Sequence, residues 1–208
     1  MEQQQVMETE ARKTKIVTRR LEKPRLDVQY PQVVGMGNRL VKRKINHSIL
    51  DAVYGLIQRQ GYVGHPEKTV TGSYQIKLHK NGVLSLLYAS SGYAQGAAHG
   101  IVYRSSQTFH LDDATEYKLA DLFKPGSFYI ARLNVIIKQE LKEREKEQDL
   151  PLLKEFSTIA ADQPFYLTER AIGVYFQLEE YTPYAVFEVP YVEVFDILNS
   201  DGPVGLMT

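Results

Sequence analysis

The 208-residue sequence contains no cysteine and no tryptophan, and its positive and negative charges are equal in number. Without cysteine the chain cannot form a disulfide framework, a thiolate nucleophile or a cysteine-based zinc site. Intrinsic disorder is also excluded, because 43% of the residues are apolar and the net charge is zero. What remains is a folded chain with 14 tyrosines, a residue that suits half-buried strands and wet binding surfaces.

Long hydrophobic runs are also missing. Residues 1–15 contain no apolar core, so neither a signal peptide nor an amino-terminal anchor is predicted. The stretch between Lys80 and Arg104 has no charged side chain, but its serines, Gln95 and His99 make it too polar for a membrane-spanning helix. The simplest expectation is a cytoplasmic protein without a membrane span.

The balanced charge is unevenly distributed along the chain. Residues 11–44 contain eleven Lys or Arg and only two acidic residues, whereas the rest of the chain is acidic overall. Such a basic segment could contact phosphates, or it could be a solvated surface. Only Tyr30 adds an aromatic side chain to this segment, and no helix-turn-helix pattern is present, so nucleic-acid binding is not favoured.

Hydrophobic spacing predicts two main helices. The first follows an N-cap at Asn38 and ends at Gly61. The second follows a cap at Ser127 and ends before Pro151. Strand-like runs lie on either side of Asn81-Gly82, a dipeptide that favours a two-residue hairpin turn.

The order of these elements predicts an α+β fold, with an antiparallel sheet built from hairpins and the two main helices packed on one face. We predict a flexible basic amino-terminal arm over residues 1–22. An amino-terminal α/β half over residues 23–105 and a carboxy-terminal α/β half over residues 106–208 are expected to form one compact body.

Several motifs that carry chemistry are incomplete or missing. The sequence Val33–Asn38 imitates a dinucleotide-binding turn, but Leu40 stands where the third glycine is needed. The sequence contains no HExxH motif and no GxSxG elbow, and no two of the five histidines are four residues apart. We therefore predict no catalytic residue, no metal ligand and no cofactor.

A glycine-rich segment at residues 90–100 is the most informative part of the chain. Small residues allow a ligand, or another backbone, to approach the main chain closely. Gln95 and His99 add two side chains that form hydrogen bonds. The segment is either a binding loop or a structural connection between strands.

This loop is the first of several motifs that occur together in one order. It precedes LADLFKPGS at residues 119–127, and three further motifs follow: Phe165–Leu167, Val174–Gln177 and Glu180–Tyr184. The set resembles a bacterial, bacilli-type family with paired domains of unknown function. That family is related to the extracytoplasmic domain of a lysozyme-sensing anti-sigma factor, where the module binds a protein. It is also related to the non-catalytic amino-terminal region of peptidoglycan deacetylases.

The loop and the resemblance together imply a binding surface. Its predicted residues are Tyr93, Gln95, Gly96, His99, Gly100, Tyr181 and Tyr184. We predict a non-catalytic binding module for a protein or a cell-wall-type glycan. Two alternatives stay open: a glycan-directed hydrolase that uses His99, and an electrostatic binder of nucleic acid or anionic surfaces.

Overall fold

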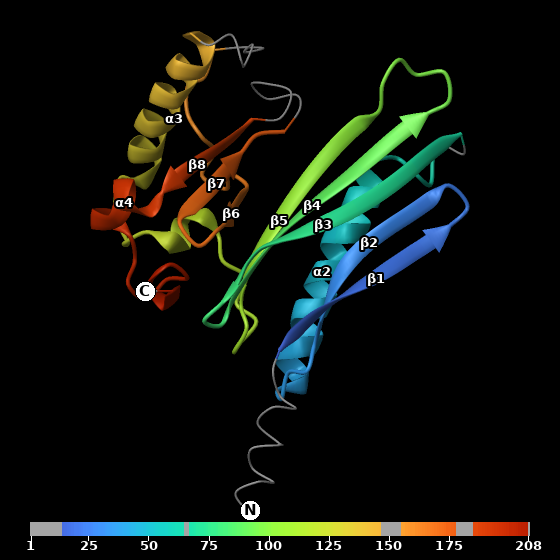
Figure 1. Cartoon of the computed structure of the whole chain (residues 1–208), viewed down its shortest axis with the longest axis horizontal. Coiled ribbons are helices and arrows are strands. Elements are labelled where there is room, and N and C mark those ends of the chain that lie inside the picture. The colour runs from blue at the N-terminus through green and yellow to red at the C-terminus, as the bar shows by residue number, and fades with distance from the viewer. Residues whose placement is uncertain (1–13, 65–66, 147–154, 178–184, 208) are drawn as a thin grey trace, which may run out of the picture. The chain divides into compact units, whose positions relative to one another are not determined.

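The computed structural model describes residues 14–64, 67–146, 155–177 and 185–207, and Figure 1 shows its elements. Their bounds are β1 (Lys15–Lys23), β2 (Leu26–Val34), α2 (Arg39–Arg59), β3 (Lys68–Lys80), β4 (Val83–Ala94), β5 (Ile101–His110), α3 (Tyr129–Lys146), β6 (Phe165–Leu167), β7 (Ala171–Tyr175), β8 (Val186–Pro190) and α4 (Tyr191–Val194). Short 3₁₀ turns occur at Leu119–Leu122, Phe195–Ile197 and Gly205–Met207. The predicted α+β class is confirmed. Among the described helices, none has the length and apolar composition that crossing a membrane requires.

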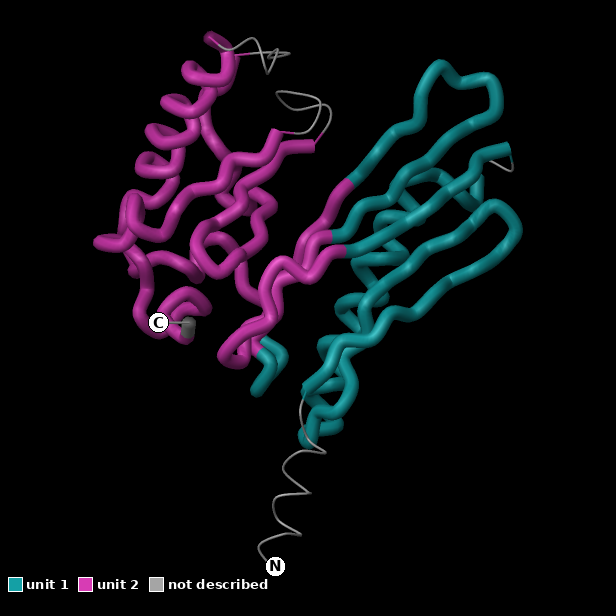
Figure 2. The backbone as a smooth tube through the Cα atoms, viewed as in Figure 1, with its two compact units in different colours: residues 1–74, 88–103, 111–115 teal, residues 75–87, 104–110, 116–208 magenta. Residues whose placement is uncertain are grey.

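The chain forms two compact units whose segments interleave along the sequence (Figure 2). Unit 1 comprises residues 1–74, 88–103 and 111–115, and unit 2 comprises residues 75–87, 104–110 and 116–208. Strands β3, β4 and β5 therefore contribute residues to both units. The boundary predicted near residue 105 falls inside β5, whereas the observed units divide β3, β4 and β5 between them.

The first hairpin includes the part of the predicted flexible arm that the structure describes, whereas residues 1–13 lie outside the described residues. Residues 15–23 form β1, which pairs with β2 in antiparallel register from Lys15 opposite Val34 to Lys23 opposite Leu26. The polarity of the segment suggested disorder. However, three apolar side chains of β1 (Ile16, Val17 and Leu21) are partly buried, and the ladder satisfies its backbone groups.

Helix α2 is the crossover between two parallel strands. Leu26–Val28 of β2 pair with Val70–Gly72 of β3 in parallel register, in a sheet of order β1-β2-β3-β4-β5. Parallel neighbours need a long connection, and α2 lies between them in the sequence. The predicted antiparallel sheet therefore contains a parallel pair of strands, β2 and β3. Because this pairing stops at Val28, Pro31 needs no hydrogen-bond partner on that side of β2.

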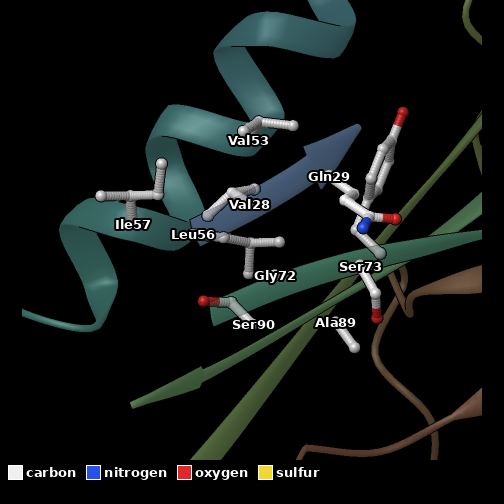
Figure 3. Close-up of a pocket in the computed structure, with 10 residues that line it drawn as sticks. Val28, Gln29, Val53, Leu56, Ile57, Gly72, Ser73, Ala89 and Ser90 are labelled. Carbon is white, nitrogen blue, oxygen red and sulfur yellow. The ribbon is translucent and has the colours of Figure 1, made fainter. Parts of the chain in front are cut away.

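The predicted limits of the first main helix are confirmed. The side-chain oxygen of Asn38 accepts hydrogen bonds from the backbone N–H groups of Leu40 and Val41, at 3.1 and 3.2 Å. Gly61, with φ of 72°, adopts the left-handed conformation that commonly ends a helix. The apolar stripe of α2 is buried, and Figure 3 shows Val53 of α2 beside Val28 of β2.

Unit 2 has its own sheet and its own core. Strands β6, β7 and β8 form an antiparallel sheet in that order. Leu133, Ile137 and Leu141 of α3 are buried in the same cluster as Phe176 and Phe187. The second predicted helix is thus confirmed as α3, but the predicted cap at Ser127 is wrong, because the buried hydroxyl oxygen of Ser127 has no hydrogen-bond partner among the described residues. The two main helices do not share one face of a single sheet, since α2 contacts β2 of the five-stranded sheet and α3 contacts β8 of the three-stranded sheet.

The predicted Asn-Gly turn forms between β3 and β4. Asn81 and Gly82 have positive φ angles of 47° and 78°, as a two-residue hairpin turn of this type requires. Asparagine and glycine tolerate this conformation better than other residues do, which is why the dipeptide identified the turn.

Candidate functional site

The glycine-rich segment is only partly a loop. Strand β4 extends to Ala94 and β5 begins at Ile101, so the connection consists of residues 95–100, which we call the tip loop. The tip loop begins with a turn in which the N–H of Ala97 donates to the carbonyl of Ala94 at 3.0 Å. Gly96 has φ of 87° in this turn, so its role is conformational.

A buried glutamine braces both strands below the tip loop. Gln60, directly after α2, is fully buried, and its Nε2 donates to the carbonyls of Ser90 at 2.7 Å and Ile101 at 3.0 Å. One amide therefore ties β4 to β5. Gly92 leaves room for it, because a Cβ at Gly92 would overlap Oε1 of Gln60. The base of the tip loop is consequently fixed by packing and by hydrogen bonds.

Three of the predicted binding side chains are exposed, one near the end of β4 and two in the tip loop. Tyr93 follows Gly92, which faces Gln60, so strand alternation directs the Tyr93 side chain to the opposite face of the sheet. Tyr93 is 49% exposed, and Gln95 and His99 of the tip loop are exposed too. We call these three side chains the tip surface.

The two predicted glycines have structural roles next to the tip surface. Gly96 forms the turn, and Gly100 lies close to the neighbouring strand, because a Cβ there would approach the carbonyl oxygen of Gly92 to 3.0 Å. The remaining two predicted binding residues, Tyr181 and Tyr184, lie outside the described residues. Only five of the seven predicted positions can therefore be placed.

The environment of His99 differs from that of a catalytic histidine. Its Nδ1 lies 3.4 Å from the carbonyl of the adjacent Gly100, and its side chain is exposed. A histidine that acts as general base is normally oriented by a second group and lies within reach of a nucleophile. In the described parts of the chain, no carboxylate contacts His99.

Another motif of the predicted resemblance has a structural role. The side chain of Gln177 forms two hydrogen bonds with the backbone of Arg104, accepting from its N–H at 3.2 Å and donating to its carbonyl at 2.7 Å. The hydroxyl of Tyr175 donates to Oγ of Ser106 at 2.9 Å. Tyr175 at the end of β7 and Gln177 just after it therefore attach this part of unit 2 to β5.

The basic amino-terminal segment carries charges that already have partners. Arg20 donates two hydrogen bonds to the carboxylate of Asp27, at 2.7 and 2.9 Å, and lies 3.2 Å from the carboxylate of Glu22. The hydrogen bond from Arg20 lowers the pKa of Asp27. Arg19 donates to the side chain of Gln32 at 2.8 Å. Fewer cations of β1 are thus available to an anionic partner than the sequence suggested.

Part of unit 2 is similar to a protein family of unknown function. Residues 120–191, within unit 2, match the model of a family described as protein of unknown function (DUF3298). No match was found among curated proteins. The predicted resemblance to a family of unknown function is therefore confirmed. The relation to the anti-sigma factor and the deacetylases stays a prediction.

Two solved structures share the fold over nearly the whole chain. One is a member of the DUF3298 family from Bacteroides fragilis, with 16% sequence identity, a TM-score of 0.66, and coverage of 94% of this chain and 96% of the other. The second is a DUF3298 family protein from Pseudomonas aeruginosa, with 12% identity, a TM-score of 0.63, and coverage of 90% and 94%. At these identities the similarity concerns the fold.

Proposed function

We propose that this protein is a non-catalytic binding module and that the tip surface is where its ligand binds. The observation that carries the proposal is the exposed ring of Tyr93 above strands that the buried amide of Gln60 ties together. A surface whose backbone is fixed before binding loses less conformational entropy when a ligand arrives. Such bracing supports recognition by preformed side chains.

The composition of the tip surface favours a glycan over a protein as the ligand. A sugar ring offers a face of C–H groups, which packs on an aromatic ring, and hydroxyl groups, which bond to amides and imidazoles. Tyr93 supplies the aromatic ring, Gln95 the amide and His99 the imidazole. A protein interface would instead be expected to have a larger apolar centre.

The predicted relation to peptidoglycan deacetylases supports a glycan of the cell-wall type. The proposal concerns the chemistry of the ligand, an N-acetylated sugar polymer or its fragments, and applies equally to an assembled wall and to soluble pieces. A protein ligand, which the predicted relation to the lysozyme-sensing factor would favour, is the competing interpretation of the same surface.

Replacing Tyr93 by alanine is expected to weaken binding to purified peptidoglycan by about tenfold, equivalent to about 1.4 kcal/mol. The reason is the loss of the aromatic platform, while the strand backbone stays paired. Co-sedimentation with insoluble peptidoglycan over a range of protein concentrations measures the change. Tyr54→Ala is the matched control, because Tyr54 is similarly exposed, at 52%, and belongs to α2 and not to the tip surface.

The result has clear alternatives. Equal affinities for Tyr93→Ala and Tyr54→Ala, or no sedimentation of the unmodified protein, would count against a glycan site at the tip surface. Release of soluble sugars by the unmodified protein, abolished by His99→Ala, would instead support the glycan-directed hydrolase.

A further inference from the structure

Unit 2 contains a groove far along the chain from the tip surface. Its volume is about 420 Å³, within the range of about 300–1,000 Å³ that is usual for small-molecule sites. The groove lies between Lys124 and the segment that follows β8. Its lining comprises Lys124, Tyr191, Phe195, Leu198, Asn199 and Ser200, together with Val204 and Gly205.

The walls of the groove are held by backbone hydrogen bonds. The N–H of Lys124 donates to the carbonyl of Ile197, and the N–H of Asn199 donates to the carbonyl of Leu122, both at 2.9 Å. On another side, the hydroxyl of Tyr191 donates to the carbonyl of Thr168 at 2.7 Å, which fixes the ring. The groove is therefore a preformed feature of this unit.

One wall presents an aromatic ring to solvent. Phe195 is 71% exposed although it lies beside the half-buried Leu198 and the buried Val204. Exposed aromatic area at a concave surface is typical of binding sites, because covering it releases water. The apolar part of a ligand would pack against Phe195 and Leu198.

A cation without a carboxylate partner lies at the same groove. The ammonium group of Lys124 donates to the backbone carbonyl of Asp196 at 2.7 Å. The carboxylate of Asp196 is bound instead by the guanidinium of Arg132 at 2.9 Å. Within the part of the chain that the structure describes, Lys124 forms no ion pair, and its ammonium group has further N–H donors for an anion.

We propose that this groove binds a small free molecule with an apolar body and a carboxylate group. The carboxylate would pair with the ammonium group of Lys124, and the apolar body would cover the ring of Phe195. An ammonium group beside an apolar wall favours this class over a neutral ligand of the same size, because the charge-assisted hydrogen bond forms next to a low-dielectric surface. This inference is independent of the glycan proposed for the tip surface.

Octanoate is a suitable probe, and 1-octanol is its neutral counterpart. Titrations of the full chain followed by ¹⁵N NMR should show octanoate binding, with 1-octanol roughly threefold to tenfold weaker. Lys124→Met keeps an unbranched side chain that is one atom shorter but removes the charge, so it should weaken octanoate binding to the level of the alcohol. Phe195→Ser should weaken both ligands. Phe128→Ser is the matched control, because Phe128 is 86% exposed but does not line the groove.

The proposal fails if octanoate causes no shifts at residues lining the groove, or if Lys124→Met binds octanoate as the unmodified protein does. An equal loss in Phe128→Ser would also overturn it, because binding would then be unspecific. Dimerisation of the unmodified protein that Phe195→Ser abolishes, seen by analytical ultracentrifugation, would assign the groove to a second copy of the chain and reject the small ligand.

Discussion

Replacing Gly173 by alanine is expected to destabilise the protein by about 3 kcal/mol, because the new methyl group has no space. Gly173 lies opposite Tyr166 in the β6–β7 ladder, and a Cβ at this position would overlap the ring of Tyr166. That ring is 3% exposed and is held on several sides. The ammonium nitrogen of Lys77 lies 4.3 Å from the centroid of the Tyr166 ring. The hydroxyl of Tyr166 donates to the carboxylate of Glu188 at 3.2 Å.

Urea unfolding followed by circular dichroism measures this loss. Gly55→Ala is the control, since nothing lies within 4 Å of a Cβ there, and alanine within α2 should stabilise by about 0.5–1 kcal/mol. Combining Gly173→Ala with Tyr166→Leu should recover part of the stability, because the smaller side chain removes the overlap. An unchanged unfolding midpoint for Gly173→Ala alone would show that the ring is not held as described.

Replacing Gln60 by alanine should cost about 2–3 kcal/mol, because the buried carbonyl of Ser90 would lose its partner and a cavity would form. The effect should extend to the tip loop, since the same amide also holds the carbonyl of Ile101. Hydrogen exchange followed by mass spectrometry is expected to show faster exchange in the segments that flank the tip loop.

Gln58→Ala provides the comparison for this variant. Gln58 lies two residues earlier on α2 and is exposed, so its replacement should change stability by less than about 0.5 kcal/mol. If Gln60→Ala and Gln58→Ala behave alike in both unfolding and exchange, the brace contributes little to the tip loop.

Local signals in the sequence were sufficient for the helices and for one turn. Asn38 and Gly61 limit α2 through their own backbone and side-chain chemistry, and Asn81-Gly82 forms its turn for the same reason. Strand β1 was missed because its stability comes from pairing with β2. The parallel pairing of β2 with β3 was missed because nothing near either strand specifies its neighbour.

The candidate site shows the same limit. Glycines at 92 and 96 look alike in the sequence, yet Gly96 provides a positive φ and Gly92 provides space for a side chain 32 positions earlier. Gln60 gave no signal at all, because a glutamine after a helix is normally solvated and its burial depends on two distant strands. Sequence therefore located the loop, whereas only the structure showed what holds it.

The central claim is that the tip surface binds a cell-wall-type glycan, and NMR titration of the ¹⁵N-labelled protein with an N-acetylglucosamine tetramer tests it most directly. We expect chemical-shift changes that saturate and are concentrated at residues 91–100, with little change around Lys124 in unit 2. Spectra that do not change, or shifts confined to regions away from Tyr93 and the tip loop, would contradict the claim.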